Sequence, residues 1–331
     1  MEHKIITLGE VMMRLSTANY ERFVQAKNFE VTYGGAEANV AISLAQFGLH
    51  TTHVTVLPDQ ELGYAAAQYL RQYGVDTSAI QYGAGRMGVY FFENGAMQRA
   101  PKIIYDRFES AFAHLDPNDT DWDQVLDGAT WLHWTGITPA ISSSVLAWTR
   151  AALDAANHKG LVISGDINYR RNLWQYGQNP QDVMPDLISK SSIIVAGMTD
   201  FENCTGITAV DYEGACQLAQ KQFPQVKYIT KTEREAISAS HNKLQGLLWN
   251  GKELIRSNIY DMSAMVDRIG GGDAYMAGLI YGLLHMKDEA AVEFATAASV
   301  LKHSIPGDAN LVSVEEVNAL VSGNNIGKLL R

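Results

Sequence analysis

The sequence predicts an α/β protein with a mostly parallel sheet flanked by helices and a small second sheet beside it. Three observations favour this class. Short apolar runs alternate with stretches of helical periodicity through most of the 331 residues. Gly, Asp or Pro residues, which favour turns, bound the apolar runs. Two segments, residues 12–34 and 86–108, break the alternation and carry strand-like patterns of their own.

The apolar runs predict the buried strands of the main sheet, and the periodic stretches predict its helices. The expected strands are residues 5–8, 52–56, 130–133, 161–164, 193–195 and 228–230. The expected helices include residues 37–47, 62–73, 143–157, 212–222 and 273–284. Strands that alternate with helices in this way pair in parallel. We therefore expect residues 1–331 to form one α/β domain.

The two interrupting segments predict the small sheet. In the second of them, the apolar run 89–92 is followed by Asn94-Gly95, a pair typical of tight hairpin turns, and by a further strand-like stretch at 97–100. A small sheet with one apolar face needs a cover, either the active site or a partner chain. The sequence thus predicts a lid sheet inserted as residues 12–34 and 86–108. It also favours a homodimer or higher homo-oligomer assembled through the lid.

Composition excludes several classes of function. The formal net charge of -10 argues against nucleic acid as a partner, because phosphate backbones demand basic patches. No stretch approaches the roughly 20 apolar residues that cross a bilayer. The first apolar run is too short for a signal peptide, and Cys204 and Cys216 lack metal-ligand or disulfide patterns. We expect no membrane partner and a cytoplasmic location.

The glycine run Gly270-Gly271-Gly272 precedes a helical stretch. Consecutive glycines let backbone N–H groups converge at a helix N-terminus, where the helix dipole favours an anion. Asp273 follows in the first helical turn, where an Asp usually caps the helix. A carboxylate beside an anion-binding loop also suits a base that removes a proton from a hydroxyl attacking a phosphoryl group.

A second glycine pair, Gly34-Gly35, opens the helix predicted near residue 37. It allows close approach of a ligand to the backbone, with Glu37 and Asn39 offering polar contacts; the alternative is a simple tight turn. The run 83–88 fits the dinucleotide pattern G-x-G-x-x-G, but it precedes a strand rather than a helix, which argues against that function. No P-loop pattern occurs in the sequence.

The segment Asp267-Arg-Ile-Gly-Gly-Gly-Asp-Ala-Tyr-Met-Ala-Gly278 resembles the C-terminal signature of the ribokinase-like (PfkB) carbohydrate kinases, and Gly34-Gly35 with Asn39 resembles their N-terminal signature. The resemblance covers essentially the whole chain. It is most specific for 2-keto-3-deoxygluconate kinases, through segments 89–95, 104–107, 134–139, 165–170 and 301–307. It implies a ribokinase-like fold, ATP and Mg²⁺ as cofactors, and a small sugar acid as the second partner.

The resemblance also implies roles for individual residues. Asp273 would be the catalytic base, with Gly270, Gly271 and Gly272 as the anion hole. Substrate contacts would come from Gly34, Gly35, Asn39, Tyr90, Tyr105, Arg107 and Arg170. Nucleotide contacts would come from Asn168, Lys231, Gly270 and Gly272. An arginine fork matches a carboxylate bidentately, and neutral-sugar kinases have no need of one.

One departure concerns the metal. Members of the family commonly carry Asn-x-x-Glu or a similar acidic run after the fifth strand, whereas residues 196–200 here read Ala-Gly-Met-Thr-Asp. Only Asp200 remains as a candidate metal ligand, and Gly197 offers no side chain. Two alternatives therefore stay open: a kinase for fructose or another sugar, and a sugar-acid-binding protein with impaired turnover.

Overall fold

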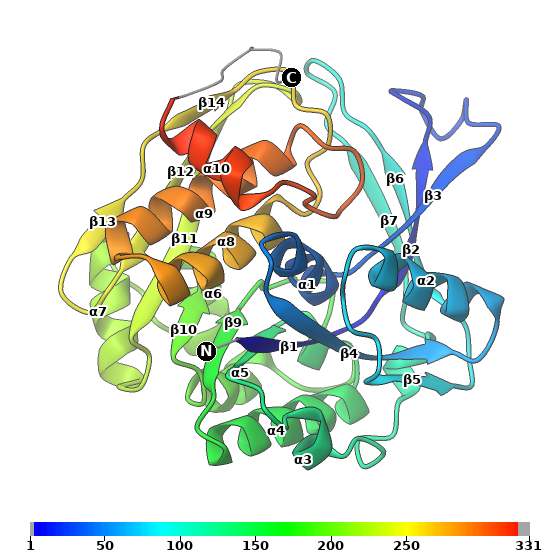
Figure 1. Ribbon diagram of the computed structural model, residues 1–331, viewed down its shortest axis with the longest axis horizontal. Coiled ribbons are helices and arrows are strands. Elements are labelled where there is room, and N and C mark those ends of the chain that lie inside the picture. The colour runs from blue at the N-terminus through cyan, green and yellow to red at the C-terminus, as the bar shows by residue number, and fades with distance from the viewer. Residues whose placement is uncertain (1–2, 324–331) are drawn as a thin grey trace.

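The computed structural model describes residues 3–323 and arranges them around one large sheet (Figure 1). Its ten strands are β1 (Lys4–Leu8), β4 (His50–Pro58), β5 (Ile80–Gly83), β8 (Trp131–Thr135), β9 (Val162–Asp166), β10 (Ile193–Val195), β11 (Tyr228–Ala236), β12 (Asn242–Trp249), β13 (Leu254–Arg256) and β14 (Tyr260–Met262). The consecutive neighbours β11-β10-β9-β8-β1-β4-β5 pair in parallel, while β12, β13 and β14 add an antiparallel edge. The predicted mostly parallel sheet is confirmed; its antiparallel edge was not predicted.

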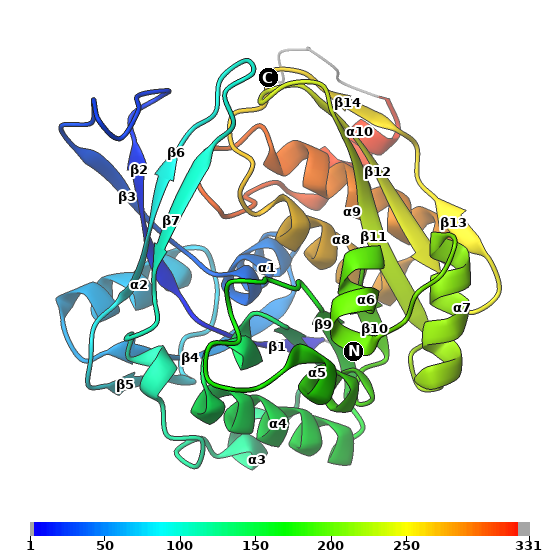
Figure 2. The same cartoon turned by 180° about the vertical axis from the view of Figure 1, so that it is seen from behind.

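Helices cover both faces of this sheet. They are α1 (Ala36–Gln46), α2 (Glu61–Gln72), α3 (Trp122–Val125), α4 (Ser143–His158), α5 (Pro180–Ile188), α6 (Met198–Thr205), α7 (Tyr212–Gln222), α8 (Gly271–His285), α9 (Asp288–Lys302) and α10 (Val314–Val321). Figure 1 shows α1, α8, α9 and α10 on the near face, and Figure 2 shows α3, α4, α5 and α7 on the other. The two layers form two large apolar cores, one on each side of the sheet.

Helix α8 is fixed by unusually close packing against α9. A Cβ atom added at Gly278 would lie 2.7 Å from Cα of Ala295, and one at Gly282 would lie 2.7 Å from Cα of Ala291. Only glycine allows these backbones to approach so closely. Most of α8 is buried, as expected for a helix that is apolar on nearly all sides. The glycine run at its N-terminus is therefore carried by a rigidly packed helix.

A separate four-stranded sheet stands beside the main one (Figures 1 and 2). It contains β2 (Met12–Thr17), β3 (Phe29–Gly34), β6 (Gly88–Glu93) and β7 (Lys102–Asp106) in the order β3-β2-β6-β7. The pairing of β2 with β6 is parallel, and the two outer pairings are antiparallel. The predicted small second sheet is thereby confirmed, built from both of the segments that interrupt the α/β alternation.

The β6–β7 connection differs from the prediction. Strand β6 ends at Glu93 and β7 begins only at Lys102, so a tight turn at Asn94-Gly95 and a strand over 97–100 are both wrong. The tight turn lies at Ala96–Arg99 because Arg99 folds back to pair with the buried Glu93 carboxylate at 2.7 Å. At the tip of this loop, the Met97 carbonyl accepts a 2.8 Å hydrogen bond from the Ala239 N–H of the β11–β12 hairpin.

Two further features of the sequence, its lack of a long apolar helix and its two cysteines, can be compared with the structure. Within residues 3–323, no helix is both long and apolar enough to cross a bilayer. Cys204 and Cys216 are both buried free thiols. Burial raises the pKa of each thiol to about 12, so neither is a reactive thiolate near neutral pH.

Candidate active site

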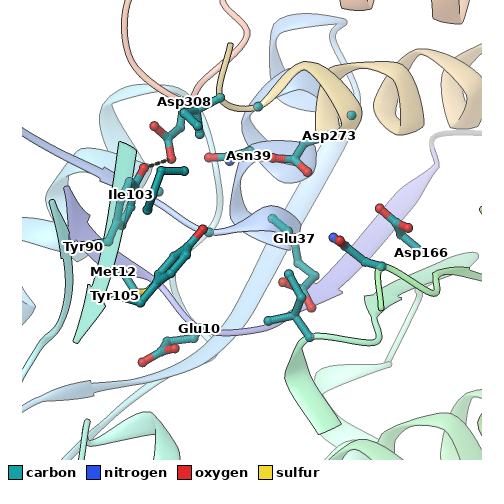
Figure 3. Close-up of a pocket in the computed structure, with 18 of the residues that line it drawn as sticks. Glu10, Met12, Glu37, Asn39, Tyr90, Ile103, Tyr105, Asp166, Asp273 and Asp308 are labelled. Atoms are coloured by element: carbon teal, nitrogen blue, oxygen red, sulfur yellow. Dashed lines mark hydrogen bonds between the residues drawn. The ribbon is translucent and has the colours of Figure 1, made fainter. Parts of the chain in front are cut away.

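A cavity of about 330 Å³ lies between the small sheet, the N-termini of α1 and α8, and the loop that follows β9 (Figure 3). This volume suits a small organic ligand. The cavity lies outside the carboxyl ends of parallel strands, the usual place for ligands in open α/β sheets. Twelve predicted site residues line it: Gly34, Gly35, Asn39, Tyr90, Tyr105, Arg107, Asn168, Arg170, Gly270, Gly271, Gly272 and Asp273. Lys231 and Asp200 are not among the lining residues.

Asp273 and Asn39 point toward one another in the cavity (Figure 3). The Asn39 amide donates from Nδ2 to Oδ2 of Asp273 at 2.7 Å. Burial raises the pKa of Asp273 to about 7; the Asn39 hydrogen bond opposes this rise, and the charges of Asp308 and Glu37 add to it. Oδ1 of Asn39 is buried and has no partner within the described residues. The pair therefore offers a titratable carboxylate and a free acceptor side by side.

The three glycines before Asp273 have different surroundings. Gly270 has a positive φ of 80°, and a Cβ atom there would lie 1.9 Å from the Asp308 carbonyl oxygen. A Cβ atom at Gly271 would lie 2.4 Å from the His303 ring. At Gly272 a Cβ atom would meet nothing within 4 Å. The first two glycines are thus required by the local packing, and the third leaves open space at the helix N-terminus.

A buried charge network that the sequence analysis missed joins the small sheet to the glycine run. Arg14 on β2 forms ion pairs with Asp267 at 2.6 Å and Asp308 at 2.5 Å, all with nearly fully buried side chains. The Tyr90 hydroxyl on β6 donates to the same Asp308 carboxylate. Asp267 in turn accepts the backbone N–H groups of Ile269 and Gly307, each at 3.0 Å. The network therefore fixes the chain on both sides of the glycines.

Tyr90 is consequently committed to Asp308. Burial raises the pKa of the Tyr90 hydroxyl well above its ordinary value, and the Asp308 charge adds to this. The Tyr105 ring lies beside it, with ring centroids 5.7 Å apart. Tyr105 is 54% exposed and has no hydrogen-bond partner in the described part of the chain. Of the two predicted lid tyrosines, Tyr105 has the hydroxyl that is free to meet a ligand.

Of the two predicted arginines, one likewise has a buried acidic partner and the other has none. Arg107 is buried and pairs with Glu10 through Nη2 at 2.5 Å and Nε at 2.8 Å. Glu10 also accepts the Ser110 hydroxyl at 2.6 Å. Arg170 is exposed at the cavity, and its one hydrogen bond within residues 3–323 is a long 3.4 Å bond to the Tyr169 carbonyl. Arg170 therefore presents a guanidinium without an acidic partner, whereas Arg107 has one.

Glu10 was not predicted, although it lies two residues after the end of β1, at the carboxyl edge of the sheet, a position typical of site residues. Glu37, which the sequence analysis considered as a polar contact to a ligand, forms hydrogen bonds within the protein instead. One of its oxygens accepts the Thr135 backbone N–H and the hydroxyls of Thr135 and Thr138, at 2.6–3.1 Å. Burial raises the pKa of Glu37, and the threonine hydroxyls oppose the shift. Glu37 therefore connects α1 to the end of β8.

Asp200, the candidate metal ligand, accepts two backbone N–H groups, from Gly197 at 2.7 Å and Tyr169 at 2.9 Å. Asp166, at the end of β9, is close by. Burial raises the pKa of Asp166 well above its ordinary value, and the charges of Asp200 and Asp273 add to the rise. No group of three or more His, Cys, Asp or Glu side chains that could hold a metal occurs in residues 3–323.

Two carboxylates with Asn168 nevertheless fit Mg²⁺, which uses one or two protein carboxylates and takes its other ligands from water and phosphates. A cation there would also relieve the repulsion between Asp166 and its acidic neighbours. Lys231, the predicted nucleotide contact, lies over the Tyr212 ring at 4.2 Å and pairs with Glu233 at 2.7 Å. The structure thus places Lys231, like Asp200, outside the lining of the cavity that holds the other predicted residues.

Comparison with known proteins adds a family to this geometry. Residues 2–313 match the model of the pfkB family of carbohydrate kinases. A 2-dehydro-3-deoxygalactonokinase from Haloferax volcanii is 28% identical over 328 residues, 99% of each chain. A 2-dehydro-3-deoxygluconokinase from Bacillus subtilis is 26% identical over 311 residues, 93% of this chain and 92% of that one.

Among solved structures, a 2-dehydro-3-deoxygluconokinase from Thermotoga maritima superimposes with a TM-score of 0.93 at 40% identity. The match covers 97% of this chain and 100% of that one. The cavity described above therefore lies in a chain that resembles sugar-acid kinases over nearly its whole length.

Proposed function

We propose, from the premise that this chain belongs to the pfkB family of carbohydrate kinases, that it phosphorylates 2-keto-3-deoxygluconate, also called 2-dehydro-3-deoxygluconate, at its terminal hydroxyl with ATP. The observation that carries the proposal is the presence of two complementary groups in the lining of one cavity. Asp273, whose pKa is about 7, can accept a proton, and Arg170 offers an unpaired guanidinium. Because ATP is the donor, we place the reaction in the cytoplasm.

Asp273 acts as the general base. In the transfer, the hydroxyl oxygen bonds to the γ-phosphorus of ATP while the bond to the bridging oxygen breaks and ADP leaves. The hydroxyl proton passes to Asp273. A carboxylate with a pKa near 7 is well matched to this role, because it is ionised at working pH and still basic. The unpartnered Oδ1 of Asn39 accepts a hydrogen bond from a sugar hydroxyl and so orients the acceptor.

The glycine run stabilises the charge that moves onto the transferring phosphoryl group. Backbone N–H groups at the start of α8 donate to the phosphoryl oxygens, and the helix dipole adds positive potential. Gly34 and Gly35 let the sugar approach the start of α1, and Asn168 contacts the nucleotide. Lys231 stays a prediction as a further nucleotide contact, which its ammonium group would make.

Arg170 recognises the substrate carboxylate. Its guanidinium can form two parallel hydrogen bonds to a carboxylate, which a neutral sugar cannot supply. The Tyr105 hydroxyl assists from the opposite wall. Arg107 acts differently, because Glu10 already occupies two of its donors. We propose that Arg107 contributes its remaining donors and holds the shape of the wall that faces the sugar.

Asp166 and Asp200, beside Asn168, are the residues that would hold Mg²⁺. When bound there, the ion supplies positive charge that neutralises the nucleotide phosphates. The Asp200 carboxylate stays close to the loop after β9 because it accepts the Tyr169 backbone N–H, and Asp166 is the last residue of β9.

A coupled ADP-release assay tests the proposed substrate. We expect turnover with 2-keto-3-deoxygluconate and ATP, and compare it with 2-keto-3-deoxygalactonate, fructose and ribose. The two keto acids share the carboxylate and differ in the configuration of one hydroxyl, so their ratio reports on the wall of the cavity that contacts this hydroxyl. A higher kcat/KM for fructose than for either acid would overturn the assignment of a sugar-acid substrate.

The small sheet is proposed to serve as lid and as dimer contact. Its strand register places Tyr90 and Tyr105 on the face toward the cavity. The opposite face carries a row of apolar side chains, one from each strand: Val31, Leu15, Phe91 and Ile104. Val31 is 53% exposed and Ile104 is 55% exposed. A second copy of this chain would cover this row, because apolar sheet faces of this kind are rarely left in water.

A further inference from the structure

Two arginines that the proposed reaction does not use lie close together beside the glycine run. Arg234 is on β11, and Arg268 lies two residues before Gly270. Burial, together with the neighbouring positive charge of Arg268, lowers the pKa of Arg234 to about 10. Neither guanidinium forms an ion pair with any carboxylate in the described part of the chain. Two like charges held near each other without a counter-charge are unfavourable unless an anion joins them.

Arg234 is held in place by a neutral residue. The His303 ring accepts an N–H of Arg234 at Nε2, across 2.9 Å. This assignment follows because Nδ1 lies 2.6 Å from the Ser299 carbonyl, where only a protonated nitrogen can bond. Burial lowers the pKa of His303 to about 4, and the charge of Arg234 adds to the effect. His303 also lies against Gly271, so it ties the Arg234 guanidinium to the glycine run.

Arg268 is tied to the same hairpin that carries Arg234. Its guanidinium donates to Oδ1 of Asn242, on β12, at 3.3 Å. Asn242 is fully buried, and its own amide donates to the Ser238 carbonyl at 3.0 Å. Arg268 also lines the cavity together with Gly270–Gly272 and Asp273. His303 and Asn242 therefore hold the two guanidinium groups beside the start of the glycine run.

The absence of acidic partners is selective. Glu233 and Glu235 flank Arg234 in the chain, but alternate residues of a strand face opposite sides of a sheet. Glu233 pairs with Lys231 at 2.7 Å, and Glu235 pairs with Lys243 at 3.4 Å. Both lysines of this hairpin are thus neutralised while its arginine is not.

We propose that Arg234 and Arg268 form a built anion site for the terminal phosphates of the nucleoside triphosphate, with His303 as the residue that positions Arg234. The inference rests on the proposed function, because it names the residues that hold the donor in that reaction. The two guanidinium groups bind phosphate oxygens that the helix N-terminus does not reach.

Calorimetric titration of the whole chain with ATP, ADP, AMP and inorganic tripolyphosphate tests the site. We expect Arg234→Gln and Arg268→Gln each to weaken ATP and tripolyphosphate binding about 10- to 100-fold, the range for a charge-assisted hydrogen bond, and AMP binding less than about 3-fold. Arg256→Gln, an exposed arginine on the neighbouring strand β13, is the matched control. Arg→Lys variants at both positions keep the charge and should recover part of the loss, which separates a lost contact from misfolding.

The outcomes separate this inference from the proposed substrate. Unchanged ATP and tripolyphosphate affinity in folded Gln variants would overturn the anion site even if sugar-acid turnover were normal. Weakened polyphosphate binding in a chain that does not phosphorylate 2-keto-3-deoxygluconate would support the site and reject the proposed acceptor. An equal loss of AMP affinity would also overturn the inference, since it would place the arginines near the α-phosphate or nucleoside.

A double-mutant cycle tests the role of His303. If His303 acts by holding Arg234, then His303→Ala should raise the KM for ATP with little change in the KM for the sugar acid. Combining it with Arg234→Gln should add less than about 2-fold to the Arg234→Gln effect. Full additivity of the two losses would show that His303 serves only to pack against the glycine run.

Discussion

Asn39 at the start of α1 donates its side-chain amide to the carboxylate of Asp273 at the start of α8, across 2.7 Å. The two residues are 234 positions apart in the chain and belong to the two helices whose N-termini frame the cavity. This bond orients one carboxylate oxygen and opposes the rise in the pKa of Asp273. It leaves the other carboxylate oxygen available to a substrate hydroxyl.

Removing the proposed base should slow the reaction without preventing binding. We expect Asp273→Asn to lower kcat about 10²–10⁴-fold, the span for loss of a general base. The side chain keeps its shape, so the affinity for the sugar acid measured by calorimetry should change little. Asp182→Asn, in the first turn of α5, is the matched control. Near-normal turnover in Asp273→Asn would remove Asp273 from the catalytic step.

The rate should depend on pH through the same carboxylate. The base is active when ionised, and its pKa is raised to about 7, so kcat/KM should fall about tenfold per unit as the pH drops below about 7. Asn39→Ala removes the hydrogen bond that lowers this pKa, so the inflection should move to higher pH. Steady-state rates between pH 5 and 9 measure both. An inflection that stays in place in Asn39→Ala would contradict the coupling.

Binding of the substrate carboxylate should depend on Arg170. We expect Arg170→Gln to raise the KM for 2-keto-3-deoxygluconate about 10- to 100-fold, because a charge-assisted hydrogen-bonded pair is lost. The KM for ATP should stay within about 2-fold. The neighbouring exposed Arg171, which is not among the cavity-lining residues, gives the control Arg171→Gln. Equal KM values for the acid in both variants would exclude this role for Arg170.

Substitutions at two positions of the glycine run should have different effects on stability and on activity. Gly270→Ala forces a side chain into a positive-φ position and against the Asp308 carbonyl, so we expect a loss of more than about 2 kcal/mol in the free energy of unfolding. Gly272→Ala has open space and a helical position, so its stability should be unchanged or up to about 1 kcal/mol higher. Its activity should still fall, because the methyl group points into space needed by the phosphoryl group.

Denaturant unfolding and kcat/KM, measured on both glycine variants, check this contrast. Full activity in Gly272→Ala would show that the phosphoryl group does not approach the start of α8.

The outer face of the lid should control assembly. Ile104→Lys places a charge in the exposed apolar row, and we expect it to shift the chain toward monomer by sedimentation or light scattering. Lys102→Gln, on the same strand, is the control. A monomeric parent chain would rule out the lid as a dimer contact.

How far the fold follows from sequence can be seen in particular elements. Strand β1 shows no alternation of apolar and polar residues because parallel strands are buried on both faces, and the apolar residues Ile5, Ile6 and Leu8 make this visible in the sequence. The predicted position of the turn after β6 was wrong because tertiary contacts move it. Arg99 pairs with Glu93 and bonds to the Tyr20 carbonyl, and these contacts move the tight turn past Asn94-Gly95.

In the site, too, local sequence patterns were predictable and contacts between distant residues were not. The glycines and Asp273 are adjacent in the chain, so local pattern was enough to bring them forward. The Glu10–Arg107 and Arg14–Asp308 pairs join residues 97 and 294 positions apart, and nothing local marks them. The sequence therefore named Arg107 as a substrate contact without showing that a buried carboxylate already holds it.

The Arg14 network has a consequence for synthesis of the protein. Arg14 belongs to the second strand of the chain, but its two carboxylate partners are residues 267 and 308. Until residue 308 has left the ribosome, burial of Arg14 would leave a charge without its full compensation, at a cost of several kcal/mol. Strand β2 is therefore translated long before the partners of Arg14, and the lid can reach its final position only after residue 308 has been made.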